Sequence, residues 1–153
     1  MVDTLQHQIF LNLHKEYCDS QNIDIESKEF LILILLFPAY LVAIADNNVD
    51  KDEKQIIGQF TFNILSEIYG GELSTDDYDR MILAYYQELK SIGENLNKWE
   101  DKFISTLTFI CANSPESLGR SVIMLMEEVS ASSNGQSDIE KQVIINISEN
   151  IKL

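Results

Sequence analysis

One short passage occurs twice in this chain, and the two copies constrain the fold that the chain can adopt. Residues 46–57 read DNNVDKDEKQII, and residues 133–144, which begin 87 positions later, read SNGQSDIEKQVI. Each copy follows an apolar helical pattern, passes through a polar turn and opens a new apolar pattern. The spacing is too long for a solenoid built from units of about 20–50 residues. We therefore expect one domain made of two related halves, each containing a helix–turn–helix corner.

Both copies contain the pattern of a helix start. Asp50-x-x-Glu53 and Ser137-x-x-Glu140 match the capping box, in which the first side chain accepts the backbone N–H of the third helical residue. The glutamate in turn reaches back to the amide of the capping residue. We expect the two corners to superpose and the two halves to be related by an approximate two-fold rotation.

An apolar run at residues 30–45 is the second strong constraint. It is almost unbroken, contains Pro38 and is flanked by Glu29 and Asp46. A membrane span needs about 20 apolar residues and usually has basic residues on one side. We therefore predict a central helix, from about 29 to 45, that the rest of the protein buries on every face. Pro38 should kink this helix or lie where a missing hydrogen bond is tolerated.

The remaining chain shows helical periodicity between sparse glycines and prolines, and no stretch alternates apolar and polar residues as a strand would. Seven helices are predicted, at about 3–18, 29–45, 50–70, 74–89, 95–111, 115–129 and from 138 onward. Ser114 is expected to cap the sixth helix, with Pro115 as its first residue. In the last helix, Ile139, Val143, Ile147 and Ile151 are expected to face inward. The predicted fold is all-α: a single compact bundle of about seven helices spanning residues 1–153, with a buried central helix and two pseudo-symmetric halves.

The charge of the chain excludes one class of partner. It has 153 residues, with 25 acidic residues against 11 basic ones and a net charge of −14. Such a chain repels phosphate backbones and anionic lipid, so we expect no nucleic acid partner. Cys18 and Cys111 lack a CxxC spacing and are expected to be free, buried thiols in a reducing compartment. The first residues do not resemble a secretory signal, which favours the cytoplasm.

The first corner also offers oxygen ligands for a cation. Carboxylate or amide side chains stand at alternate positions: Asp46, Asn48, Asp50 and Asp52. This resembles the start of an EF-hand loop, but the glycine and the glutamate that the loop requires are replaced by Lys51 and Ile57. A bound cation would therefore need a shorter oxygen cluster completed by Glu53 or by acids of another segment. The alternative is a solvated acidic turn that only caps the helix.

The corner at residues 45–53 resembles the motif of the TerB-like tellurite-resistance family. That motif reads Ala-Asp-Gly, any residue, an aliphatic residue, Ser or Asp, two residues and Glu, and the chain departs from it only at Asn47. The second copy departs further, with Ser133 in place of Asp, but keeps Ser137 and Glu140. The resemblance implies a non-enzymatic, acidic helical module of tellurite and chemical-stress responses that can bind calcium or magnesium. The residues expected to hold the cation are Asp46, Asn48, Asp50, Asp52, Glu53, Ser137 and Glu140.

Two other functions stay open. A metal-dependent enzyme is less expected, since His7 and His14 are the only histidines and no Glu-x-x-His spacing is present. His14 and Cys18 could form half of a zinc site, but a hydrogen-bonded pair is the more common arrangement. The third possibility is an acidic protein-interaction module that binds no metal. In either binding role we expect a protein partner, which could meet the chain at a membrane surface, and no transmembrane segment.

Overall fold

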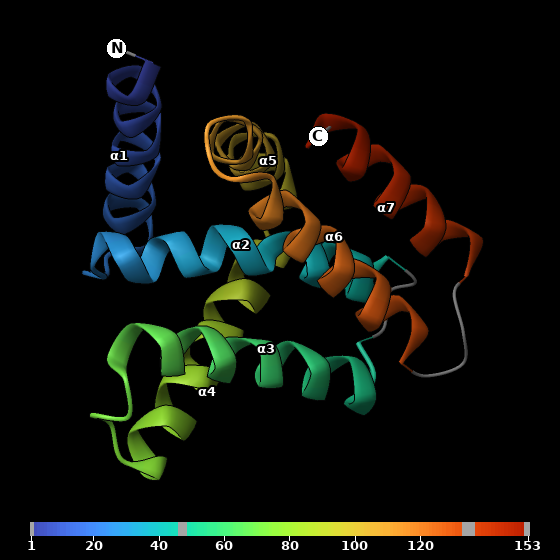
Figure 1. The fold of residues 1–153 in the computed structure, drawn as a ribbon, viewed down its shortest axis with the longest axis horizontal. Coiled ribbons are helices and arrows are strands. Elements are labelled where there is room, and N and C mark those ends of the chain that lie inside the picture. The colour runs from blue at the N-terminus through green and yellow to red at the C-terminus, as the bar shows by residue number, and fades with distance from the viewer. Residues whose placement is uncertain (1, 46–48, 133–136, 152–153) are drawn as a thin grey trace.

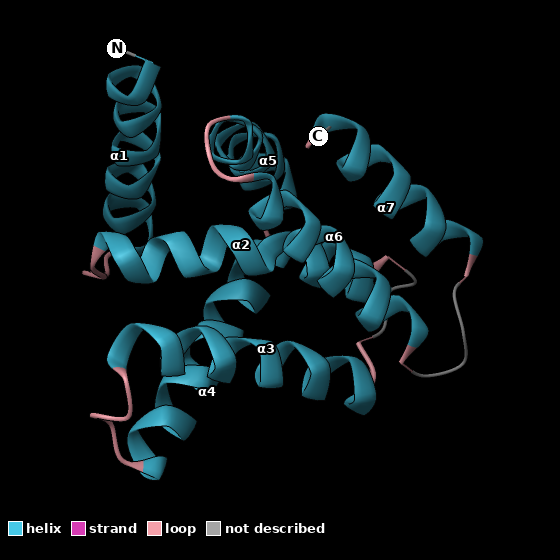
Figure 2. Cartoon of the chain, in the orientation of Figure 1, coloured by secondary structure: helices cyan, strands magenta, loops and turns pink. Residues whose placement is uncertain are grey.

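Seven helices make up the described part of the chain. The computed structural model describes residues 2–45, 49–132 and 137–151, and these ranges contain helices and loops without a strand (Figures 1 and 2). The helices are α1 (Val2–Gln21), α2 (Ser27–Ile44), α3 (Lys51–Tyr69), α4 (Thr75–Gly93), α5 (Leu96–Ala112), α6 (Glu116–Ala131) and α7 (Asp138–Asn150). The all-α prediction and the predicted number of helices are confirmed.

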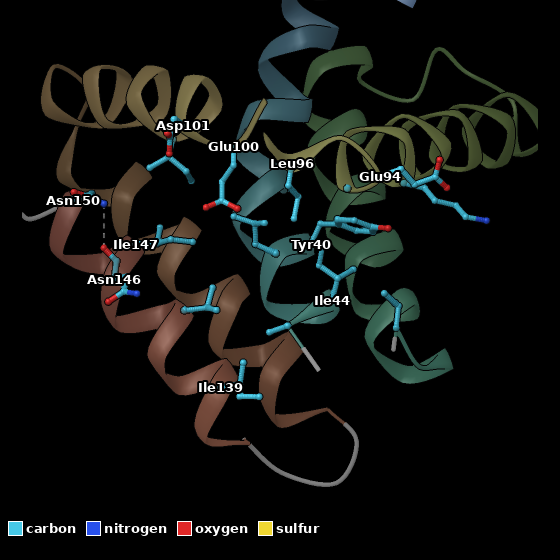
Figure 3. Close-up of a pocket in the computed structure, with 17 residues that line it drawn as sticks. Tyr40, Ile44, Glu94, Leu96, Glu100, Asp101, Ile139, Asn146, Ile147 and Asn150 are labelled. Atoms are coloured by element: carbon cyan, nitrogen blue, oxygen red, sulfur yellow. Dashed lines mark hydrogen bonds between the residues drawn. The ribbon is translucent and has the colours of Figure 1, made fainter. Parts of the chain in front are cut away.

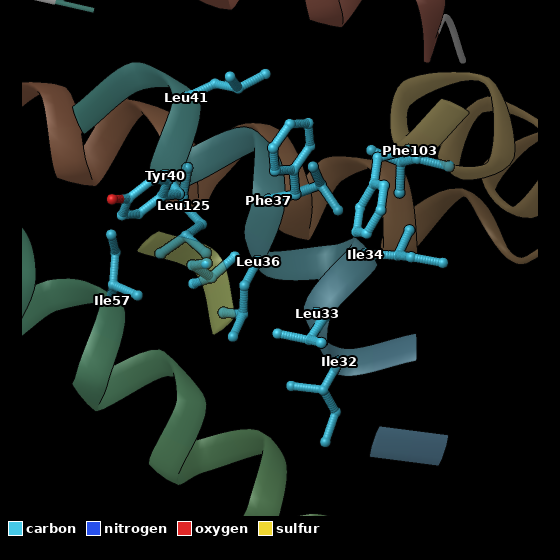
Figure 4. Close-up of a cluster of buried hydrophobic side chains, with 14 of the residues drawn as sticks. Ile32, Leu33, Ile34, Leu36, Phe37, Tyr40, Leu41, Ile57, Phe103 and Leu125 are labelled. Atoms are coloured by element: carbon cyan, nitrogen blue, oxygen red, sulfur yellow. The ribbon is translucent and has the colours of Figure 1, made fainter. Parts of the chain in front are cut away.

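Helix α2 is the centre of the fold, as predicted from its apolar sequence. It packs against each of the other six helices and crosses the middle of the molecule in Figure 1. Its length and composition would suffice to span a membrane, but 67% of its residues are buried inside the protein. Figure 4 shows its side chains, among them Leu33, Leu36 and Phe37, enclosed by those of other helices. A helix that is apolar on every face is thus covered by protein, which is typical of a core helix.

Pro38 lies inside α2 and is buried, and the helix is continuous across it. Because proline has no N–H, the carbonyl of Ile34 loses its usual partner four residues along the helix. The neighbouring helices on all sides hold α2 together at this point. No strand occurs in residues 30–45, so this part of the prediction is confirmed.

The helix starts follow the capping patterns of the sequence at three places. Asp50 and Ser137 form complete capping boxes at the starts of α3 and α7, and the side chain of Ser74 accepts the N–H of Asp77 at the start of α4. Gly70 ends α3 with a left-handed backbone at φ 57°, a conformation that glycine adopts without strain. The predicted two-fold relation between the halves stays a prediction, and the turns at residues 46–48 and 133–136 lie outside the described residues.

The start of α6 differs from the prediction. The hydroxyl of Ser114 donates to the carbonyl of Ile110 at 2.6 Å, so it completes the end of α5 and does not cap α6. Pro115 occupies the N-cap position with φ −54° and ψ 144°, and the helix begins at Glu116. The predicted cap and the predicted first helical residue are therefore each wrong by one position. The reason is local competition, since a serine next to a helix end can bond either helix.

The inward face of α7 also differs from the prediction. Ile147 and Ile151 are buried as expected, but Ile139 is 57% exposed, and Ile144 is buried although it was not predicted to be. Helix α7 packs mainly against α2 and α6, so its buried face is turned toward that pair. In the first turn Glu140 is the buried residue, so the inward face runs through Glu140 and Ile144, and Ile139 lies beside it on the face that lines a groove.

Candidate functional site

The two capping glutamates, Glu53 of α3 and Glu140 of α7, meet in the interior. Their exposed fractions are only 2% and 3%. The Oε1 atom of each accepts the backbone N–H of its own capping residue, Asp50 or Ser137, at 3.0 Å. In addition, the two carboxyl groups lie within reach of each other, and Glu140 adds to the rise that burial causes in the pKa of Glu53. The glutamates thus begin their helices and also connect the two copies of the duplicated passage.

The same two helix starts hold the glutamates by their backbone. The N–H of Glu53 donates to Oδ1 of Asp50 at 2.8 Å, and the N–H of Glu140 donates to the hydroxyl oxygen of Ser137 at 3.1 Å. These bonds, together with those that the carboxyl groups accept from the capping amides, fix both side chains. Each carboxyl group is therefore presented in one orientation, with its position set by a helix terminus.

Burial changes the acidity of this pair. Removal from water raises the pKa of Glu53 to about 7, while the bond from the amide of Asp50 opposes the rise and the negative charges of Asp50 and Glu140 add to it. Two carboxylates repel each other, whereas a carboxylate and a carboxylic acid can share a hydrogen bond. In the absence of a cation, the arrangement therefore favours one proton held between the two glutamates.

No basic side chain neutralises the pair among the residues that the structure describes. The ion pairs there join Lys28 to Glu26, Arg80 to Asp77, Lys102 to Glu16 and Arg120 to Glu116. Lys54, which follows Glu53 in the chain, instead places its ammonium group 4.6 Å from the centre of the Tyr86 ring, and Lys141, which follows Glu140, is exposed. Burial, and after it the charge of Glu53, raises the pKa of Tyr86. Within residues 2–45, 49–132 and 137–151, the pair therefore has no basic partner.

The structure brings together part of the predicted cation set. Asp50, Glu53, Ser137 and Glu140 belong to the joined helix starts. Asp52 lies exposed in the first turn of α3, and Asp46 and Asn48 lie outside the described residues. Within the described ranges, no three His, Cys, Asp or Glu side chains are grouped so that they could hold a metal ion. The ligands that the described geometry offers are the two buried carboxylates.

The meeting of Glu53 with Glu140 was not predicted. Sequence reasoning assigned each glutamate to a separate corner, because a capping box explains both locally. The signal that could have joined them is their equal position in the two copies of the passage. In an arrangement with two-fold symmetry, equivalent residues near the axis lie next to each other.

The possible zinc ligands have other roles. Nε2 of His14 lies 2.6 Å from the carbonyl oxygen of Ile25, and its ring stacks on that of Phe30 with the centroids 5.1 Å apart. Cys18 is half-buried and Cys111 is buried, and both are free thiols, as predicted. Burial raises the pKa of Cys111 to about 11, which disfavours its reactive thiolate. The side chain of His7 lies outside the described residues. His14 is therefore a half-buried residue that packs on Phe30 and interacts with the carbonyl of Ile25.

Comparisons of the chain with protein-family models, with curated proteins and with solved structures found no match. The resemblance to the TerB-like family therefore depends on the motif at residues 45–53 and its partial copy. The functional argument below starts instead from the two glutamates that the fold brings together.

Proposed function

We propose that this chain is a non-enzymatic, acidic helical module whose two corners together bind one hard divalent cation, magnesium or calcium. The observation that carries this proposal is the contact between Glu53 and Glu140, two buried carboxyl groups with no basic partner among the described residues. The TerB-like motif supports it from the sequence side and links the module to tellurite and other chemical stress.

The chemistry of the pair suits a hard cation. Each glutamate uses Oε1 for the amide of its capping residue, so its second oxygen can serve as a ligand without breaking the capping box. A divalent ion between these oxygens would replace the shared proton and neutralise both charges. Magnesium commonly takes one or two protein carboxylates and keeps several waters, whereas calcium takes six to eight oxygens. The two described carboxylates therefore satisfy magnesium more easily than calcium.

The helix termini help to keep both ligands ionised. Each carboxylate lies in the first turn of its helix, where the positive end of the macrodipole favours a negative charge by about 0.3–1 kcal/mol. This contribution opposes the desolvation that raises the pKa of Glu53. A cation adds the attraction that is needed to make the doubly ionised pair favourable. Binding would then hold α3 and α7 together through their starts.

Thermal unfolding of metal-stripped protein tests the proposal. A cation that binds only the folded state at a hundredfold excess over its dissociation constant stabilises it by about 2.7 kcal/mol. We expect millimolar magnesium or calcium to raise the melting temperature of the wild type but not of the Glu53→Gln, Glu140→Gln double variant. Glutamine still supports a capping box, so the helix starts are kept.

A matched control removes one exposed acid from each of the same helices, through Glu67→Gln in α3 and Glu149→Gln in α7. This variant changes the net charge by the same amount and should keep the full response to the cation. The proposal fails if the wild type melts at the same temperature with and without the cation. It also fails if the control loses the response as completely as the glutamate double variant does.

A further inference from the structure

A groove of about 730 Å³ lies between α7 and the junction of α4 with α5 (Figure 3). The C-terminal end of α2 forms its floor through Tyr40, Leu41 and Ile44. Helix α7 packs mainly against α2 and α6, so it stands apart from α4 and α5 across this space. The volume is typical of a binding site, and the groove is separate from the Glu53–Glu140 contact.

One wall of the groove is an apolar strip along α7. Ile139, Val143 and Ile147 recur every fourth residue and therefore share a face of the helix. Ile139, although 57% exposed, lies at one end of this strip. From Ile139 to Ile147 the strip rises by about 12 Å, which corresponds to about two turns. The strip therefore matches the length over which a docked helix makes contact.

The opposite wall is acidic. Glu94, Glu100 and Asp101 line it and are exposed, and Figure 3 shows Glu100 directed into the groove. Lys90 is the one basic residue in the lining. None of the three acids belongs to the ion pairs that the structure describes. The groove thus combines an apolar wall and floor with three acidic side chains that take part in none of the described ion pairs.

We propose that this groove binds an amphipathic helix of a partner protein that carries basic residues along one flank. Aliphatic side chains of the partner, three and four residues apart, would cover Ile139, Val143 and Ile44, as in other helix-in-groove complexes. Lysine or arginine on the flank would face Glu94, Glu100 and Asp101. The proposal concerns a different surface from the cation site and does not depend on it.

The charge of the groove favours a basic helix over the other possible occupants. A second copy of the chain would bring a further net charge of −14 to the acidic wall, which opposes self-association. A fatty acid or an anionic lipid would place its own negative group beside the same carboxylates. A small cationic amphiphile satisfies the charge but has only one head group, whereas the acids are spread over the end of α4, at Glu94, and the second turn of α5. A basic helix can present several positive charges, spaced so that they face all three acids.

Binding of three labelled peptides to the full chain tests the proposal. The first is an amphipathic peptide of about 15 residues with leucines on one face and lysines on the flank. The second carries glutamate in place of each lysine, and the third has the first composition in scrambled order. We expect fluorescence anisotropy at about 150 mM salt to show binding of the first peptide, at least about tenfold tighter than of either other peptide.

Two pairs of variants locate the binding. Ile139→Gln should weaken binding of the first peptide about tenfold, whereas Ile145→Gln should leave it within about twofold. Ile145 is a suitable control because it is 49% exposed on the same helix but does not line the groove. Glu100→Gln with Asp101→Asn should also weaken binding, while Glu127→Gln with Glu128→Gln, the same change of charge on exposed residues of α6, should not.

Several results would overturn the inference. Equal binding of the first and the scrambled peptide would mean attraction to an acidic protein in general. Equal effects of Ile139→Gln and Ile145→Gln would place the peptide elsewhere. Sedimentation that shows a dimer broken by Ile139→Gln would identify a second copy as the occupant. Displacement of the peptide by dodecyltrimethylammonium, together with tighter binding of that compound, would identify a small amphiphile.

Discussion

The carboxyl groups of Glu53 and Glu140 meet inside the protein, although the residues lie 87 positions apart in the chain. Each is also bonded to the amide that begins its own helix. The pair therefore links local structure to tertiary structure, because the residues that start α3 and α7 also join the two copies of the repeated passage. We expect the protonation of the pair, and under our proposal a bound cation, to determine the strength of that link.

Stability should fall as the pH rises through neutrality. The pKa of Glu53 is raised from 4.5 to about 7 in the folded state, so the folded protein holds a proton that the unfolded chain releases between these values. The stability that this proton provides is fully present below about pH 4.5 and is lost as the pH passes the folded pKa of about 7. Urea unfolding of metal-free protein at pH 5 and pH 8 should show a loss on the order of 2 kcal/mol from this group.

The variant Glu53→Gln isolates that effect. A neutral glutamine keeps the capping box and can donate to Glu140, so the variant should match the wild type near pH 5 and exceed its stability at pH 8. Asp52→Asn, which removes an exposed acid one position away, should keep the slope of the wild type. An unchanged slope in Glu53→Gln would show that the buried pair does not hold the proton.

The capping bond of Ser137 should contribute measurably to stability. Ser137→Ala removes the acceptor of the N–H of Glu140 and should lower the free energy of unfolding by about 1 kcal/mol. Asn95 occupies the N-cap of α5 without a side-chain capping bond, and its amide makes only an exposed bond of 3.2 Å to the carbonyl of Ser91, so Asn95→Ala should cost less. Urea unfolding of both variants checks the difference. Equal losses would mean that the capping bond of Ser137 adds nothing beyond the change of residue.

Two glycine-to-alanine changes should have opposite effects. A Cβ atom at residue 93 would lie 2.8 Å from Cε2 of Tyr40, which is buried and lines the groove, so Gly93→Ala should destabilise the protein by about 1–3 kcal/mol. A Cβ atom at residue 58 would make an ordinary contact of 3.6 Å with Cγ2 of Ile82. Gly58→Ala should stabilise α3 by about 0.5–1 kcal/mol, because alanine favours a helix interior. Thermal unfolding would reveal both signs, and a stabilising Gly93→Ala would contradict the packing described here.

Local features of the fold were predictable from the sequence because neighbouring residues determine them. The capping boxes at Asp50 and Ser137, the end of α3 at Gly70 and the burial of α2 follow from side-chain chemistry over a few positions. The start of α6 was missed by one residue, since Ser114 bonds the preceding helix instead. Two helix ends compete there for one hydroxyl, and the sequence alone does not decide between them.

The site itself depends on tertiary packing. Nothing within a capping box indicates that Glu53 and Glu140 also meet each other, because the box already satisfies each of them. The exposure of Ile139 has a similar origin, since packing turns the neighbouring Glu140 and Ile144 inward and leaves Ile139 outside the buried face. Helical periodicity predicts which residues share a face, but it does not show which part of that face a neighbour covers.

Calorimetric titration of magnesium, and then calcium, into metal-stripped protein tests the central claim most directly. Measured near pH 7 in two buffers with different ionisation enthalpies, the heats give the number of bound ions and the number of released protons. If Glu53 and Glu140 share one site, binding should saturate at about one equivalent and release a proton. Both signals should vanish in the Glu53→Gln, Glu140→Gln variant. Saturation at two equivalents, or binding that survives in that variant, would contradict a single site formed by the two corners.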